Sequence, residues 1–173
     1  MLLTVTNSNF LFFRSLSMDK IQIVDFIKSL GSDLDIKEGK QFTEVTAPAS
    51  KLHSIAGMLK DKEETSFDFL VCITGVDYGH DLGVIYHLRS TKYGHTIVLK
   101  TRTADRENPL FDSVTDIWKG ADLHEREALD LLGIKFAGHP DPKRLFLNSS
   151  KTSFLVCSSN SILFLSFKDS RLF

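Results

Sequence analysis

Two segments in the first third of the chain carry apolar side chains at helical spacing. In residues 19–30 the apolar positions fall on one face, and Gly31 follows as a stop signal. Residues 49–61 repeat apolar side chains at i, i+3, i+4 and i+7. Both segments therefore predict amphipathic helices. Residues 41–48, between them, predict a short strand that ends at Pro48. The apolar positions of the two helices are Ile23, Phe26, Ile27 and Leu30, and Leu52, Ile55, Ala56 and Leu59.

Three apolar runs rich in β-branched and aromatic residues follow, at residues 66–76, 83–90 and 95–103. The glycine-containing turns between them are too short for crossover helices, so the runs predict an antiparallel meander. His87 and Arg89 alternate with apolar residues and should face solvent or a partner, whereas Cys72 is expected in the core. A last helix is expected over residues 123–132. The predicted fold class is α+β, an antiparallel meander sheet with helices packed on one side.

Both ends of the chain differ in composition from the middle. Residues 18–147 hold 21 of the 22 acidic residues, and seven of the 14 phenylalanines lie in the two short ends. We interpret residues 1–17 as an extension or a targeting-like segment ahead of Met18. Residues 148–173, which are rich in serine, are interpreted as an atypical tail, either divergent or a gene-model artefact. The predicted domain is therefore 18–147.

Composition and motifs exclude several classes of function. The net charge of −1 and the lack of a basic run argue against a nucleic-acid partner. The two cysteines, Cys72 and Cys157, do not form a Cys-x-x-Cys motif. Gly75, Gly79 and Gly83 fall in a hairpin connection and do not open a helix, so they are turn glycines and not a nucleotide-binding loop. We expect no cofactor and no metal on this chain.

Residues 123–144, LHEREALDLLGIKFAGHPDPKR, are the most informative stretch. Asp122 and Glu125 have the spacing of a capping box, Arg126 and Asp130 can pair at i, i+4, and Gly133 suits the residue that closes a helix. Glu125 also borders the apolar side of the helix, where a carboxylate needs a partner. Two interpretations stay open: Glu125 caps the helix, or a neighbouring protein supplies its partner.

Catalytic interpretations of the same stretch are weaker. A zinc-protease motif needs a second histidine four residues after His124, and position 128 is alanine. Glu125 and Glu127 diverge on a helix, so an acid–base pair or a metal site built from them and Asp130 is disfavoured. The Gly-His-Pro-Asp-Pro run is a stiff loop that is expected to display its histidine and the cations behind it for docking.

The stretch EREALDLLGIKFAGHPDPKRLFL strongly resembles the signature of the C subunit of NADH-quinone oxidoreductase, respiratory complex I. The upstream segment DSVTDIWKGAD is similar to the family's lead-in, and the resemblance covers roughly residues 18–147. From residue 148 onward nothing matches. The matching residues are Glu125, Arg126, Glu127, Asp130, Leu131, Leu132, Gly133, Ile134, Gly138, His139, Pro140, Lys143, Arg144 and Leu145.

The resemblance implies a scaffold subunit of the peripheral arm that carries no catalytic centre. NADH, FMN, iron–sulfur clusters and quinone would be bound by partner subunits, with electron transfer from NADH to quinone coupled to ion translocation. The implied location is the cytoplasmic side of the cell inner membrane, as a peripheral protein, or the matrix side of the mitochondrial inner membrane. The implied docking residues are Glu125, Arg126, Glu127, Asp130, Gly138, His139, Pro140, Lys143 and Arg144.

Three other functions stay open on the sequence. One is the equivalent subunit of a membrane-bound hydrogenase or of a formate-hydrogen-lyase-type complex. The second is a stand-alone enzyme using Glu125, Asp130 and His139. The third is an interaction module without a redox role.

Overall fold

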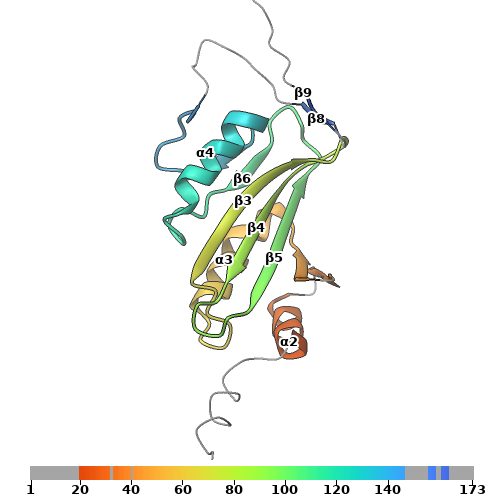
Figure 1. The fold of residues 1–173 in the computed structure, drawn as a ribbon, viewed down its shortest axis with the longest axis vertical. Helices are drawn as coiled ribbons and strands as arrows, with labels where there is room; N and C mark the ends of the chain where they lie inside the picture. The colour runs from red at the N-terminus through yellow and green to blue at the C-terminus, as the bar shows by residue number, and fades with distance from the viewer. Residues whose placement is uncertain (1–19, 32, 40, 147–155, 159–160, 164–173) are drawn as a thin grey trace, which may run out of the picture.

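The computed structural model describes residues 20–31, 33–39, 41–146, 156–158 and 161–163 (Figure 1). Its helices are α2 (Lys20–Leu30), α3 (Leu52–Asp61), which the 3₁₀ turn η2 (Ala49–Lys51) precedes, and α4 (Ala121–Leu132). Its strands are β1 (Asp35–Glu38), β2 (Thr43–Thr46), β3 (Phe69–Asp77), β4 (Leu82–Arg89), β5 (Thr96–Thr103), β6 (Leu110–Asp112), β7 (Lys135–Ala137), β8 (Val156–Ser158) and β9 (Ser161–Leu163).

The main sheet has the strand order β1-β2-β5-β4-β3. Strands β3, β4 and β5 are joined antiparallel in sequence order, which confirms the predicted meander and the α+β class. The sheet also contains a parallel pair, because β2 lies beside β5 with Val45 opposite Leu99. Two short parallel strands, β6 and β7, form a separate ladder that brings the segment before α4 next to the segment after it.

The core lies between one face of the sheet and the helices. The four predicted core residues of α3 are all buried, and Ile23 and Ile27 of α2 join the same cluster. From the sheet, alternate residues such as Val84, Tyr86 and Leu88 point into this core. In Figure 1, α3 lies behind the strands and α4 runs beside β3. The predicted packing of helices on one side of the sheet is thus confirmed.

An irregularity in β3 changes which residues reach the outer face of the sheet. The pairing with β4 shifts between Leu70 and Cys72, and both Leu70 and Ile73 belong to the core. The two residues between them therefore lie on the outer side, as expected for a β-bulge. Val71 is 45% exposed and Cys72 is partly exposed. The expectation that Cys72 is a core residue is therefore wrong, since the alternation of burial is interrupted at the bulge.

Close contact between α4 and the sheet depends on Gly75 in β3. A Cβ atom at this position would lie 2.7 Å from Leu132 Cδ1 and 3.3 Å from Ile134 Cδ1. Ala128, on the same side of α4, would lie 3.5 Å away through its own Cβ. The absence of a side chain at Gly75 thus lets the helix approach the strand, and this approach sets the position of the polar residues that α4 carries.

The predicted terminal segments, 1–17 and 148–173, fall almost entirely outside the described residues. Only β8 and β9 are described there, as a two-stranded antiparallel ladder. None of the helices in the described ranges combines the length and the apolar character needed to cross a membrane.

We predict opposite effects for substitutions at two glycines. Gly75→Val should lower the free energy of unfolding by about 1–3 kcal/mol, because the added methyl groups overpack the contact between β3 and α4. Gly57→Ala is the control: Gly57 lies inside α3 and an added Cβ would meet nothing within 4 Å. It should raise stability by about 0.5–1 kcal/mol through helix propensity. Urea unfolding followed by circular dichroism measures both, and a Gly75→Val variant as stable as the parent would contradict the packing argument.

Candidate functional site

Helix α4 begins differently from the predicted capping box. Gly120 is the N-cap residue and provides no side-chain hydrogen bond, while Asp122 lies inside the first turn. An acidic residue there still suits the positive end of the helix dipole. Gly133 closes the helix in the left-handed conformation, at φ 70°, as predicted. The capping interpretation of Glu125 is wrong, because its carboxylate bonds to Ser113 and Val114 and not to the amide of the N-cap residue Gly120.

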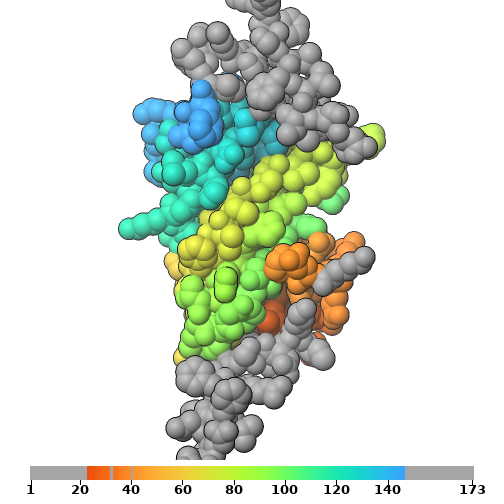
Figure 2. All heavy atoms as spheres, in the orientation of Figure 1, coloured from red at the N-terminus to blue at the C-terminus, as the bar shows by residue number. Residues whose placement is uncertain are grey.

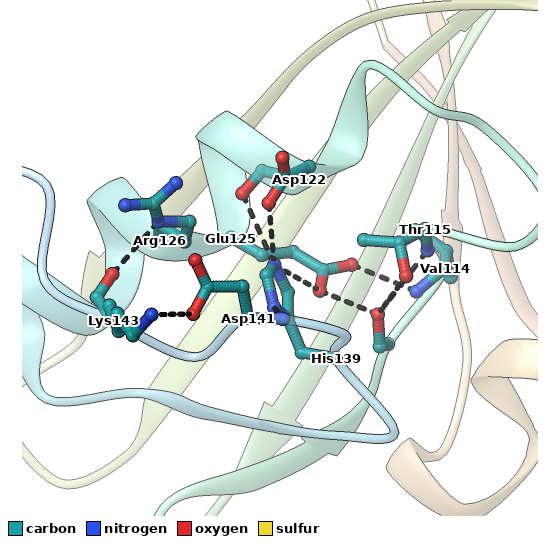
Figure 3. A network of polar contacts seen from close by, with 9 residues as sticks. Val114, Thr115, Asp122, Glu125, Arg126, His139, Asp141 and Lys143 are labelled. Carbon is teal, nitrogen blue, oxygen red and sulfur yellow. Dashed lines mark hydrogen bonds and ion pairs between the residues drawn. The ribbon is translucent and has the colours of Figure 1, made fainter.

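Glu125 is fully buried, and its hydrogen-bond partners come from the segment that precedes α4 (Figure 3). The backbone amide of Val114 donates to Oε1 at 2.8 Å, and the hydroxyl of Ser113 donates to Oε2 at 2.7 Å. Ser113 also contacts the hydroxyl of Thr115 at 2.9 Å. A buried carboxylate is tolerated when its oxygens accept hydrogen bonds in this way. The chain itself therefore supplies the partners that the sequence left unassigned.

Burial raises the pKa of the Glu125 carboxyl above its usual value. The hydrogen bonds from Val114 and Ser113 and the nearby His139 oppose this effect without cancelling it. Glu125 is thus held where its charged form is disfavoured relative to water. Glu125 also affects the buried Tyr86. The pKa of Tyr86 is raised mainly by burial and further by the charge of Glu125.

His139 lies on the other side of Glu125 and points inward. Its side chain is only 2% exposed, with Nε2 3.9 Å from Glu125 Oε2 and 3.2 Å from Asp122 Oδ1. The backbone amide of Asp141 donates to Nδ1 at 3.0 Å, which places the ring proton on Nε2, where it can donate to the Asp122 carbonyl at 3.3 Å. The prediction that the loop displays His139 outward is therefore wrong.

Two further contacts hold residues 138–146, named here loop 138–146, against α4. Arg126 Nε donates to the carbonyl of Lys143 at 2.9 Å, and Asp130 Oδ2 accepts from the amide of Phe146 at 2.6 Å. Arg144 Nε also lies 3.9 Å from Asp130 Oδ1. The predicted ion pair between Arg126 and Asp130 is not among these contacts. Helical spacing allowed that pair, but each side chain instead bonds to the loop.

The polar residues of the signature thus separate into two groups. Glu125, Asp130 and His139 have buried side chains and Arg126 is partly buried, and all four hold loop 138–146 on α4. The remaining predicted docking residues are exposed: Glu127, Gly138, Pro140, Lys143 and Arg144. Gly138 adopts φ 79°, which turns the chain sharply at the start of the loop. Sequence reasoning missed Ser113, because nothing marks a serine in an irregular segment as the partner of a distant glutamate.

Two exposed apolar side chains frame this site. Leu123, on the outer side of α4, is 56% exposed, and Phe146, at the end of loop 138–146, is 69% exposed. The Lys143 side chain is 78% exposed between charged neighbours. Large apolar side chains set among polar ones are typical of a protein–protein contact surface. The site is thus a rigid loop and helix that present a mixed surface.

Two features of the described ranges concern metal binding and nucleophilic chemistry. Among those residues no group of three or more His, Cys, Asp or Glu side chains could hold a metal ion. A groove of about 480 Å³ beside α3 contains a His53–Asp116 contact of 2.8 Å. The neighbouring Ser54 hydroxyl donates to the Lys51 carbonyl, so it is not aligned with His53 as a nucleophile.

The structure thus defines an α+β domain in which buried polar residues hold a surface loop against α4. Residues 45–154 match the family described as respiratory-chain NADH dehydrogenase, 30 Kd subunit. This chain belongs to that family, which confirms the resemblance to the C subunit of NADH-quinone oxidoreductase.

Individual relatives agree with the family. The C subunit of the Moorella thermoacetica NADH-quinone oxidoreductase is 40% identical over 121 residues, covering 69% of this chain and 80% of that protein. The C/D subunit of the Phocaeicola vulgatus NADH-quinone oxidoreductase is 51% identical over 104 residues, which cover 60% of this chain. The match spans only 20% of that relative's length. A chain of the membrane-bound sulfane sulfur reductase, an archaeal respiratory membrane complex, shares the fold with a TM-score of 0.64 at 24% identity, over 73% of this chain and 75% of that one.

We predict that Glu125→Gln changes how stability depends on pH. Because the folded-state pKa of Glu125 is raised, its contribution to stability is fully present below the unfolded value of about 4.5 and is lost as pH rises through the folded pKa. The glutamine side chain has one hydrogen-bond acceptor and one donor and does not titrate, so the variant does not lose stability in this way. The free energy of unfolding of the parent should therefore fall relative to the variant as pH rises above 4.5. Urea unfolding at several pH values measures the difference, and a difference that stays constant with pH would refute the prediction.

Proposed function

We propose that this chain is a non-catalytic scaffold subunit of a membrane-bound NADH-quinone oxidoreductase. The observation that carries the proposal is the use of the signature itself, because its buried polar residues hold loop 138–146 on α4. Family membership supports the oxidoreductase context. The chain would contribute surface and rigidity, while electrons pass through other subunits.

The docking surface that we propose is the exposed side of α4 together with loop 138–146. Leu123 and Phe146 are its apolar anchors, and Glu127 and Lys143 are its charged rim. Two prolines, Pro140 and Pro142, stiffen the loop, which reduces the conformational entropy lost on binding. The buried residues Glu125, Asp130 and His139 act indirectly, because they fix the geometry of the surface.

The fused relatives favour a particular neighbour. The Phocaeicola vulgatus protein is named as a combined C/D subunit, and the part that matches this chain is a fifth of its length. Linking two units in one polypeptide gives them a high effective concentration, which suits units that stay in contact. We therefore propose that the first partner of the docking surface is the equivalent of the D portion of that fused relative.

Within this proposal the cofactors belong to the partners. NADH, FMN, iron–sulfur clusters and quinone would be bound by other subunits, and the docking surface would face the quinone-site and terminal-cluster subunits of the peripheral arm. Membrane association would arise through the complex, on the cytoplasmic side of the cell inner membrane or the matrix side of the mitochondrial inner membrane. Ion translocation would be coupled to the electron transfer of the complex as a whole.

Mass spectrometry of native-gel bands from the source membranes tests the proposal. The chain should migrate with the other subunits of an NADH-quinone oxidoreductase, in a band that oxidises NADH with quinone. The purified chain alone should oxidise no NADH. Migration with hydrogenase or formate-hydrogen-lyase subunits would assign the chain to that related complex instead. Turnover of a substrate by the isolated chain would overturn the scaffold proposal.

We predict that Leu123→Ser and Phe146→Ser each reduce incorporation into the complex at least about fivefold. Stability of the isolated chain should change by less than about 0.5 kcal/mol, because both side chains are exposed. Leu110→Ser, at a similarly exposed leucine on β6, is the matched control and should incorporate normally. Quantitative native-gel blotting measures incorporation, and thermal unfolding measures stability. Equal incorporation of all three variants would rule out the proposed docking surface.

A further inference from the structure

The outer face of the main sheet is covered by no helix in the described part of the chain. This face is opposite α3, and the side chains of β3 and β5 form much of the surface that faces the viewer in Figure 2. A sheet face that stays in water normally carries polar residues at alternate positions. Here many of the outer positions on the meander are apolar or thiol-bearing, and the face includes two of the large exposed apolar residues of the structure. The apolar or thiol-bearing outer positions with exposed or partly exposed side chains are Phe69, Val71, Cys72, Val76 and Ile85.

An arginine at one end of this face is held by an aromatic ring. The Arg102 guanidinium carbon lies 3.8 Å from the centre of the Tyr78 ring. The ring in turn lies over β4 at Gly83, where an added Cβ would meet Tyr78 Cε2 at 2.8 Å and Arg102 Cγ at 3.3 Å. Stacking on the ring fixes the plane of the guanidinium and leaves its edges free to donate hydrogen bonds. Arg102 is therefore a preorganised donor for a carboxylate.

A second arginine marks the opposite end. Arg89 pairs with Thr96 in the sheet register and is exposed, whereas Arg102 pairs with Gly83. Among the described residues no carboxylate pairs with either arginine, while Lys100 between them is paired with Glu44 at 2.7 Å. Because Arg89 lies opposite Thr96, six positions before Arg102 on β5, the two cations are about 20 Å apart along the strand direction.

We propose that this outer face binds an amphipathic helix of a partner subunit that carries carboxylates near both ends. A helix is the element that packs on the face of a sheet, whereas a strand would add to an edge. A helix covers about 20 Å in about 13–14 residues, which sets the spacing expected between its acidic groups. Its apolar side would cover Val71, Cys72 and Ile85, and its carboxylates would meet Arg89 and Arg102. The proposal rests on membership of a multisubunit complex, and it uses a surface separate from α4 and loop 138–146.

Cys72 lies on this face, on the edge strand β3, and serves as a natural probe. Its sulfur is 3.4 Å from His87 Nδ1 and it is partly exposed. In a Cys157→Ser background, alkylation of Cys72 by N-ethylmaleimide should be at least about tenfold slower in the assembled complex than in the isolated full chain. Arg89→Glu combined with Arg102→Glu should restore the rate in the complex at least about fivefold. Lys62→Glu, an exposed cation that follows α3, is the charge-matched control and should restore nothing.

A photo-crosslinking residue in place of the exposed Thr74 identifies the occupant independently of thiol reactivity. The expected cross-link joins this position to a helix of another subunit with Asp or Glu residues about 13 positions apart. Equal alkylation rates in the complex and in the isolated chain would overturn the proposal, as would a cross-link to a second copy, to residues of the same chain or to a segment without acidic groups. These outcomes are separable from failure of the scaffold proposal, in which the chain would not migrate with the complex at all.

Discussion

The carboxylate of Glu125 is the constraint on which the site depends. It lies at the contact between three separate segments of the chain: the residues before α4, α4 itself, and the loop that follows β7. An unsatisfied carboxylate there would cost several kcal/mol, so the hydrogen bonds from Ser113 and Val114 must be in place for α4 to pack. A single buried acid thereby specifies how the three segments meet. An exposed salt bridge would not do so, because it contributes little to stability.

Much of the fold could be predicted from the alternation of apolar and polar residues. The helix at Leu52–Asp61 has the buried face expected of it, and the three strands of the meander lie where their apolar runs place them. The parallel pairing of β2 with β5 and the short β6–β7 ladder were not predictable in this way. Both join segments that lie far apart in sequence. Strands of only three or four residues are too short for their sequence to indicate which strand they pair with.

The contacts made by the polar residues of the signature differ from those that the sequence predicted. The resemblance and the charge pattern both indicated α4 and loop 138–146. Helical spacing, however, describes only contacts within a helix, and it suggested a cap at Glu125 and an ion pair of Arg126 with Asp130. The structure uses each of these side chains for a contact outside the helix. A conspicuous group of charges can therefore be internal support, while less conspicuous neighbours such as Leu123 and Phe146 are exposed to solvent.

The parallel contact between β2 and β5 has a consequence for synthesis of the chain. The sequence between β2 and β5 contains α3, β3 and β4. Strands β1 and β2 can therefore join the sheet only after β5 has been made. Ribosomes add roughly 5–20 residues per second, which leaves a delay of several seconds between the two events. During that interval the β1–β2 hairpin has an unpaired edge, and nascent chains arrested before residue 96 should therefore be clients of chaperones that bind such edges.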